Sequence, residues 1–231
     1  MLQTAATNIL PNWRETISAN LERVSAQRVR ALFTEINPHL AEDLRFENRW
    51  TTKRQDAAVL VPIIDRADGP TVLLTVRSSQ LASHAGQISF PGGRVDDGDA
   101  DRIATALREA HEEVGIPPAA VDVLGALGVH HGGLGFAVTP VVGIVDARAP
   151  IAANPHEVAE IFEAPLAWFA DLANHTTEER EHQGVAYRMF AAPYGGFHIW
   201  GLTAGILRSL AETLQPHGGE GRQPAAGGGR Q

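Results

Sequence analysis

Three glutamates, Glu109, Glu112 and Glu113, lie close together near the middle of the chain. On a helix, which turns about 100° per residue, their side chains fall within an arc of roughly 100°. Like charges at this spacing repel by about 0.2–0.5 kcal/mol per pair, and acids in a last turn oppose the helix dipole. A cation between the carboxylates would relieve that repulsion. Because the ligands are all oxygens, we expect a hard ion, Mg²⁺ or Mn²⁺.

The glutamates belong to the clearest helical pattern in the sequence. Its apolar residues recur at three- and four-residue steps: Ile103, Leu107, Ala110 and Val114. Asp99 or Asp101 can cap the start of this helix, and Gly115 can end it. Glu113 lies nearest the apolar face, so the pattern predicts a carboxylate close to the protein core.

A Gly92-Gly93 pair precedes this helix and changes how its acids are interpreted. Taken alone, the acids would fit a solvated surface on which Arg108 and Glu112 form an ordinary pair four residues apart. Glycine, however, lets backbone amides and carbonyls approach a metal ion or a phosphate oxygen closely. The combination favours a site for a cation and an anionic substrate.

Strands are expected on both sides of the central helix. Apolar and β-branched runs predict strands at 57–64, 71–76, 121–127 and 136–145, the first two forming a hairpin. Helical patterns cover 13–33, 157–169 and 199–214. This alternation implies a mixed α/β or α+β layer fold.

Three regions follow from these patterns. We expect a helical extension at 1–50, the main domain at 51–214, and a tail at 215–231. The tail is rich in Gly, Pro and polar residues and cannot bury enough surface to offset its ordering entropy, so we expect it to be disordered.

Composition excludes several classes of protein. The formal net charge of −8 disfavours nucleic-acid binding. Without cysteine there is no disulfide, thiolate metal site or cysteine nucleophile. The first residues lack a basic and then apolar leader, and the apolar runs are shorter than the roughly 20 residues of a membrane span. We therefore expect a cytoplasmic protein without a membrane partner.

The segment from Gly93 to Ile116 resembles the Nudix box, whose usual form is G-x5-E-x7-R-E-U-x-E-E-x-G-U with U aliphatic. Residues 108–116, R-E-A-H-E-E-V-G-I, fit the second half of the box. One residue is inserted in the first half, where Asp99 is the nearest acid to the box's first glutamate. The resemblance implies a Nudix-type α/β/α sandwich with a mixed sheet.

Residues 73–93 are similar to a second motif, L-L-T-x-R-S/A-x3-R-x3-G-x3-F-P-G-G, of the coenzyme A pyrophosphatase branch. That branch also carries the longer box. Every fixed position matches except the second arginine, which is Ala82 here. Segments 136–143 and 194–204 also look like this branch.

The resemblance implies hydrolysis of a nucleoside diphosphate linkage with Mg²⁺ or Mn²⁺. The substrate would be coenzyme A or acyl-coenzyme A, cut to 3′,5′-ADP and a 4′-phosphopantetheine species. The residues implied are the metal ligands Glu109, Glu112 and Glu113; the catalytic residues Arg108, Glu109 and Glu113; and the substrate-binding residues Arg77, His84, Gly92 and Gly93. Arg108 would orient a box glutamate, with Glu112 nearest to it on the helix surface.

Several alternatives stay open. The general base could be Glu109, Glu113, Glu157 or Glu160, and we favour a box glutamate. Because of Ala82, the substrate could instead be ADP-ribose, a dinucleotide or an oxidised nucleotide. A ligand-sensing module without catalysis is a third reading, against which the intact acidic box argues. The helices at 1–50 could cover one face, close over the site or form a dimer contact, and the oligomeric state is left open.

Overall fold

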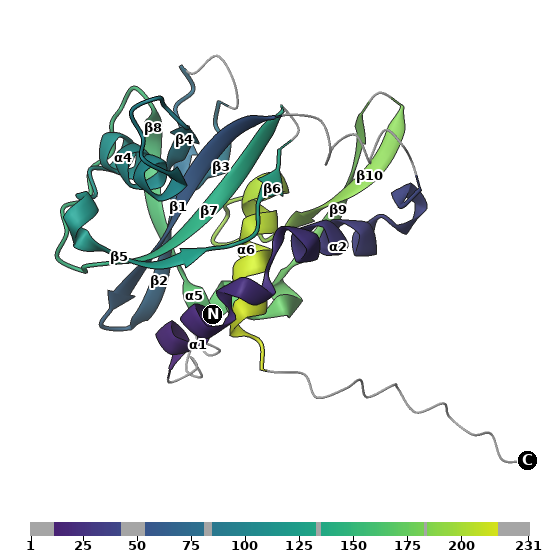
Figure 1. The fold of residues 1–231 in the computed structure, drawn as a ribbon, viewed down its shortest axis with the longest axis horizontal. Helices are drawn as coiled ribbons and strands as arrows, with labels where there is room; N and C mark the ends of the chain where they lie inside the picture. The colour runs from purple at the N-terminus through teal and green to yellow at the C-terminus, as the bar shows by residue number, and fades with distance from the viewer. Residues whose placement is uncertain (1–11, 43–53, 81–84, 133–134, 183, 217–231) are drawn as a thin grey trace, which may run out of the picture.

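The computed structural model describes residues 12–42, 54–80, 85–132, 135–182 and 184–216. Within these ranges a mixed sheet of eight strands forms the centre of the molecule (Figure 1). Its strands are β1 (Gln55–Arg66), β2 (Gly69–Arg77), β3 (Ile88–Ser89), β4 (Gly92–Arg94), β5 (Val121–Ala126), β6 (His130–His131), β7 (Phe136–Val145) and β8 (Val158–Pro165). Strands β9 (Thr176–His182) and β10 (Val185–Ala191) form a separate hairpin.

The large sheet is mixed because β1 and β7 run parallel while the other pairs are antiparallel. Its main order is β3–β2–β1–β7–β5. Strand β8 pairs with β2, β4 with the first part of β1, and β6 with the start of β7. The predicted hairpin of β1 and β2 is confirmed. Strand β1 is central and buried on both faces, which explains the nearly unbroken apolar run at its centre.

Helices cover both faces of this sheet (Figure 1). They are α1 (Trp13–Asn20), α2 (Ala26–Ile36), α4 (Arg102–Val114), α5 (Leu166–Ala170) and α6 (Gly201–Leu214), with 3₁₀ turns η1 (Leu21–Arg23), η2 (Pro38–Leu40), η3 (Pro118–Ala120) and η4 (Leu172–Asn174). Ala106 and Ala110 of α4 pack in the core on one face with Leu60. Leu207 of α6 packs in the core on the other face with Val61. The protein therefore has the predicted α/β sandwich with a mixed sheet.

Helix α4 begins and ends as the sequence predicts. The Asp101 carboxylate accepts a hydrogen bond from the Ala104 amide at 2.8 Å. Gly115 adopts the left-handed conformation (φ 70°), and its amide donates to the His111 carbonyl oxygen at 3.0 Å. Left-handed backbone favours glycine, so Gly115 stops the helix directly after the acidic turn.

The N-terminal helices pack against the α6 side of the molecule. Trp13 and Ile17 are buried in the same core as α6. The Asn20 side chain donates to the Thr213 carbonyl oxygen at 2.9 Å, and Arg28 donates to both carboxylate oxygens of Glu212 at 2.7 and 2.8 Å. Of the roles considered for this extension, the described residues show it covering one face.

The predicted helix at 157–169 is wrong for most of its length. The chain forms strand β8 up to Pro165, and only α5 is helical. Hydrogen bonds to β2 satisfy the β8 backbone, and its apolar side chains alternate between two cores. Ile161 packs on the α4 side and Phe162 on the α6 side. Burial on both faces removed the period-two pattern that identifies a half-buried strand.

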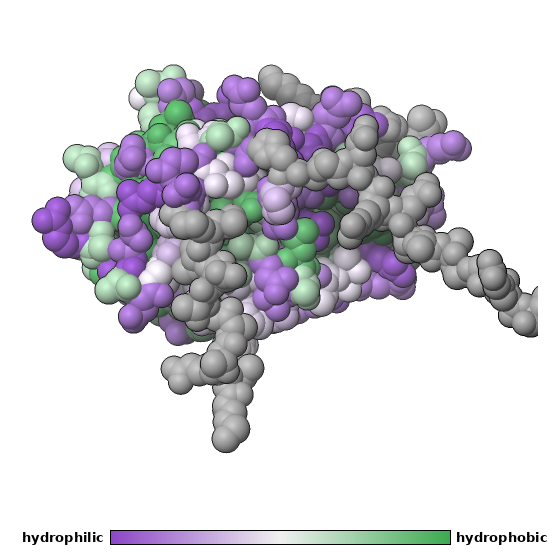
Figure 2. All heavy atoms as spheres, turned by 90° about the horizontal axis from the view of Figure 1, so that it is seen from below, coloured by the Kyte–Doolittle hydropathy of each residue, from purple (hydrophilic) through white to green (hydrophobic). Residues whose placement is uncertain are grey.

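The hairpin of β9 and β10 was not predicted from the sequence. Its first strand, TTEEREH, is polar on both faces and mostly exposed, so it lacks an apolar alternation. On the face drawn in Figure 2, hydrophilic side chains are interspersed with smaller hydrophobic areas. No helix among the described residues has the length and apolar character needed to cross a membrane. Residues 217–231 of the predicted tail lie outside the described residues.

His130 is a buried, hydrogen-bonded residue of the α6 side. It is 5% exposed, with Nδ1 2.9 Å from the Gly128 carbonyl oxygen and Nε2 3.0 Å from Ser209 Oγ. In the tautomer that satisfies both contacts, Nδ1 donates and Nε2 accepts. Burial lowers the pKa of His130 to about 4. The folded protein therefore holds a neutral imidazole where the unfolded chain would bind a proton below about pH 6.5.

This difference predicts a loss of stability as the pH falls. The contribution of neutral His130 to the free energy of unfolding is fully present above pH 6.5 and decreases as the pH falls toward 4. At pH 5 the free energy of unfolding should be lower by about 2 kcal/mol. Urea unfolding between pH 8 and pH 5 should therefore show a smaller pH dependence for His130→Asn than for wild type. His156→Asn, at an exposed position, should behave like wild type. Equal pH dependence in all three proteins would contradict the prediction.

Candidate active site

The candidate site begins where strand β4 packs beneath helix α4. A Cβ atom on Gly92 would lie 2.4 Å from the Ala58 carbonyl oxygen, where backbone cannot move aside. A Cβ atom on Gly93 would lie 2.4 Å from Glu109 Oε1, so the carboxylate itself would have to move. The two glycines allow the strand to approach the acidic face of the helix directly.

Glu113 is the most buried carboxylate of the site. It is 3% exposed, as its place beside the apolar stripe predicts. Its Oε2 accepts a hydrogen bond from the Gly92 amide at 3.2 Å, and its Oε1 lies 3.8 Å from Arg77 Nη1. Burial raises the pKa of Glu113 to about 7, and the Glu157 and Glu109 carboxylates add to the rise. The amide and Arg77 act in the opposite direction.

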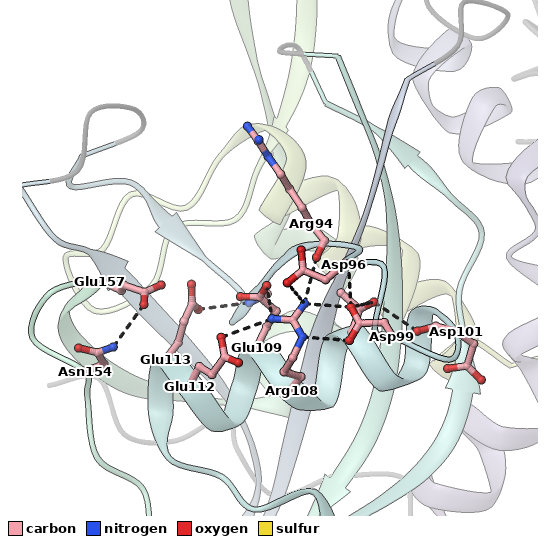
Figure 3. A network of polar contacts seen from close by, with 12 residues as sticks. Arg94, Asp96, Asp99, Asp101, Arg108, Glu109, Glu112, Glu113, Asn154 and Glu157 are labelled. Atoms are coloured by element: carbon pink, nitrogen blue, oxygen red, sulfur yellow. Dashed lines mark hydrogen bonds and ion pairs between the residues drawn. The ribbon is translucent and has the colours of Figure 1, made fainter.

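Glu109 and Glu112 lie at different depths. Glu109 Oε1 accepts a hydrogen bond from Arg108 Nη1 at 2.8 Å, and its side chain is 15% exposed. Burial raises the pKa of Glu109, while Arg108 lowers it. Glu112 is half exposed and lies 3.4 Å from the same Arg108 nitrogen. All three acids share one helix end, and Glu112 is at its outer margin (Figure 3).

Arg108 connects the loop, the helix and strand β4 (Figure 3). Its Nε and Nη2 each lie 2.9 Å from the Asp99 carboxylate, and Nη2 also donates to the Arg94 carbonyl oxygen at 3.1 Å. Arg108 and the Asp96 amide hold the pKa of Asp99 well below its usual range. The prediction that Glu112 is the glutamate nearest to Arg108 is wrong, because Glu109 lies 2.8 Å from Arg108 Nη1 and Glu112 lies 3.4 Å from it. Asp99 binds the guanidinium and turns it toward Glu109. The sequence had marked Asp99 only as a capping candidate and the acid nearest the inserted position.

Arg77 stands beside the carboxylates at the end of strand β2. Its Nε is buried and has no hydrogen-bond partner among the described residues. The Arg77 amide donates to the Gln87 carbonyl oxygen at 2.9 Å, and the Arg77 carbonyl oxygen accepts from the Gly86 amide at 3.0 Å. The placement leaves donors next to Glu113 that could bind a phosphate oxygen. His84 and Ala82 lie outside the described residues.

Of the downstream acids, Glu157 lies closer to the site than Glu160. The Asn154 side chain donates to Glu157 Oε1 at 3.2 Å. Glu157 lies beside Glu113 in Figure 3 and contributes to the raised pKa of both Glu109 and Glu113. Glu160 is exposed on β8, opposite Val76 of β2.

The donors fit a hard divalent cation in their chemistry. They are carboxylate oxygens and nearby glycine backbone, with no sulfur. Burial is the main cause of the raised pKa of Glu113, and a cation would also relieve the smaller contribution from repulsion by Glu157 and Glu109. Within the described ranges, no three acidic or histidine side chains are arranged so that they could bind one metal ion without moving. Glu112 is turned toward Arg108, so its carboxylate would have to rotate to join the other two.

Comparison with known proteins agrees with this geometry. The model of the NUDIX domain matches residues 53–189, which include β4, α4 and the whole acidic cluster. The chain belongs to the Nudix family. Membership supports hydrolysis of a nucleoside diphosphate linkage, and Nudix hydrolases generally use divalent metal ions.

Similar proteins come from bacteria and from C. elegans. The uncharacterized Nudix hydrolase NudL of Escherichia coli K12 is 48% identical over 164 residues, covering 71% of this chain and 85% of NudL. NudL of Shigella boydii gives the same values. Among solved structures, Nudix hydrolase RenU of M. Smegmatis is 25% identical with a TM-score of 0.43, covering 51% of this chain and 74% of RenU. A C. elegans Ap4A hydrolase is 22% identical with a TM-score of 0.42, covering 48% of this chain and 80% of the hydrolase.

The contact between Gly93 and Glu109 predicts the effect of one methyl group. Gly93→Ala should displace the Glu109 carboxylate and lower the rate of diphosphate hydrolysis by about tenfold or more, while the protein still folds. Gly98→Ala is the matched control, because a Cβ atom there meets nothing within 4 Å. Steady-state kinetics and thermal unfolding of both variants test this. Equal activity of Gly93→Ala and Gly98→Ala would refute it.

The ion pair of Arg108 and Asp99 predicts a second effect. Asp99→Asn keeps the side-chain size but removes the charge, so Arg108 should hold Glu109 less firmly and activity should fall about tenfold. Asp97→Asn makes the same charge change at an exposed position of the same loop and should leave activity near wild type. Hydrolysis rates at saturating metal measure the difference, and similar rates for the two variants would count against the role of Asp99.

Proposed function

We propose that this Nudix protein hydrolyses the diphosphate of coenzyme A or acyl-coenzyme A. The products would be 3′,5′-ADP and 4′-phosphopantetheine or its acyl form. The observation that carries the proposal is the position of Arg77 beside Glu113, 3.8 Å apart. Arg77 and Gly92-Gly93 belong to the motif at 73–93 that is typical of the coenzyme A pyrophosphatase branch.

In this proposal Glu109, Glu112 and Glu113 hold Mg²⁺ or Mn²⁺. When bound, the ion would neutralise diphosphate charge and activate the attacking water. Arg77 would bind a phosphate oxygen and hold the diphosphate next to Glu113. Arg108, held by Asp99, positions the Glu109 carboxylate through the 2.8 Å contact. Gly92 and Gly93 give the substrate close access to the backbone, and His84 is proposed to contact phosphate.

The attacking water also needs a base to accept its proton. A box glutamate remains our proposal, since Glu109 and Glu113 lie against Gly93 and Gly92, where the diphosphate and the attacking water are proposed to bind. Glu157 is the stronger of the two downstream candidates, because it is close enough to affect the pKa of Glu113 while Glu160 is exposed on β8.

A second substrate class is supported by Ala82, which replaces the second arginine of the motif. That class comprises ADP-ribose, dinucleotides and oxidised nucleotides, with the same metal-dependent chemistry. In either case the partner is a small nucleotide rather than a nucleic acid. We propose a cytoplasmic location, supported by the cysteine-free composition.

The direct test incubates the purified protein with coenzyme A, ADP-ribose or a dinucleotide, each with Mg²⁺ or Mn²⁺, and identifies products by mass. We expect 3′,5′-ADP from coenzyme A in preference to cleavage of the others. Preferred cleavage of another diphosphate would select the second substrate class. Tight binding without hydrolysis of any substrate would mean a ligand-sensing module.

Substitution of the buried glutamate tests the catalytic assignment. Glu113→Gln should lower the turnover of coenzyme A by about two orders of magnitude at limiting metal, because a metal-binding charge is lost. Glu181→Gln, on the exposed part of β9, is the matched control and should turn over like wild type. Wild-type turnover by Glu113→Gln would remove Glu113 from the proposed site.

A further inference from the structure

Arg94 follows the glycine pair directly, yet its side chain leaves the acidic cluster. Its carbonyl oxygen is fixed by Arg108 Nη2 at 3.1 Å, so its backbone is part of the site. Figure 3 shows its guanidinium pointing away from Glu109 and Glu113. The side chain therefore starts beside the acidic cluster and extends away from it.

The sheet register places Arg94 on the face opposite α4. Arg94 pairs with Ala57 of β1, and Ala57 pairs with Val138 of β7. Side chains alternate along a strand, so Ala57 shares a face with Val59 and Val61, which pack in the α6 core. Arg94 thus projects on the α6 face, while the carboxylates belong to the α4 face.

On that face Arg94 lies over an aromatic ring. Its Cζ is 5.4 Å from the ring centroid of Phe136, a partly buried residue two positions before Val138. A cation over a ring is held in place and keeps its N–H donors available for another acceptor. Among the described residues none forms an ion pair with Arg94, which is exposed.

A second arginine, Arg54, lies near Phe136. Arg54 donates from Nη1 to the Gly132 carbonyl oxygen at 2.8 Å, and the Gly132 amide donates to the Phe136 carbonyl oxygen at 3.0 Å. A Cβ atom on Gly132 would lie 3.8–3.9 Å from Leu202 and Phe136, which is ordinary van der Waals contact, so Gly132 packs beside the Phe136 ring. Two arginines therefore lie at one sheet end of a chain whose net charge is −8.

We infer that Arg94, held over Phe136, binds the 3′-phosphate of the nucleoside and so selects substrates that carry one. This inference rests on the proposed hydrolysis of coenzyme A. In that substrate the ribose ring alone separates the 5′-diphosphate from the 3′-phosphate. Arg77 serves the diphosphate beside Glu113, and Arg94, one residue beyond Gly93, serves the second anionic group. A guanidinium suits this role because it can donate two hydrogen bonds to one phosphate.

Binding tests the inference independently of catalysis. We would measure the affinity of wild type and Arg94→Ala for 3′,5′-ADP and for 5′-AMP by calorimetry. The two ligands differ by the 3′-phosphate alone. Arg94→Ala should weaken the affinity for 3′,5′-ADP by about 10- to 100-fold and change the affinity for 5′-AMP by less than about twofold. Arg148→Ala, which removes an equal charge from a 90% exposed side chain, should change neither affinity.

Kinetics completes the test with coenzyme A and dephospho-coenzyme A. Arg94→Ala should lower kcat/KM for coenzyme A about 10- to 100-fold, mainly through KM, and leave dephospho-coenzyme A near wild type. An unchanged ratio of affinities for 3′,5′-ADP and 5′-AMP in Arg94→Ala would overturn the inference, as would equal losses for both coenzyme A substrates. Failure of wild type to cleave either coenzyme A substrate would instead overturn the proposed function.

Discussion

The burial of a carboxylate between helix α4 and a glycine strand is the constraint on which the site depends. Glu113 is 3% exposed, and an ionised carboxylate there has lost most of its hydration. The protein compensates with the Gly92 amide and with Arg77, yet the pKa of Glu113 still rises to about 7. A site in this state favours a cation, since a divalent ion supplies the positive charge that the protein only partly provides.

One guanidinium holds the parts of this site together. Arg108 binds the loop through Asp99, the strand through the Arg94 carbonyl oxygen, and the acidic cluster through Glu109. Because Asp99 binds Nε and Nη2 of the planar guanidinium, the position of Nη1, which contacts Glu109, is fixed as well. The positive charge of Arg108 thus offsets part of the repulsion among the glutamates of α4, and Asp99 fixes the orientation of its guanidinium.

The central sheet separates two groups of charged side chains. Its α4 side carries the glutamates of the acidic cluster, and its α6 face carries Arg94 over Phe136. Strand β1 pairs with both β4 and β7, so it holds the two faces in register. The N-terminal helices stabilise the α6 side through Trp13, Ile17 and the pair of Arg28 with Glu212. The NUDIX domain match covers residues 53–189, so helices outside this match also stabilise the sheet.

The sequence by itself determined the elements whose signals are local. The end of α4 at Gly115, its start after Asp99 or Asp101 and the inward position of Glu113 all follow from caps and helical spacing, which depend on neighbours in the chain. The structure selects Asp101 as the cap. Only the tertiary structure decided that 158–165 is a strand, because pairing with β2 and burial on both faces override its helical spacing. The same holds for the partners of Arg108 and Arg94, since a long side chain takes its direction from groups that folding brings near it.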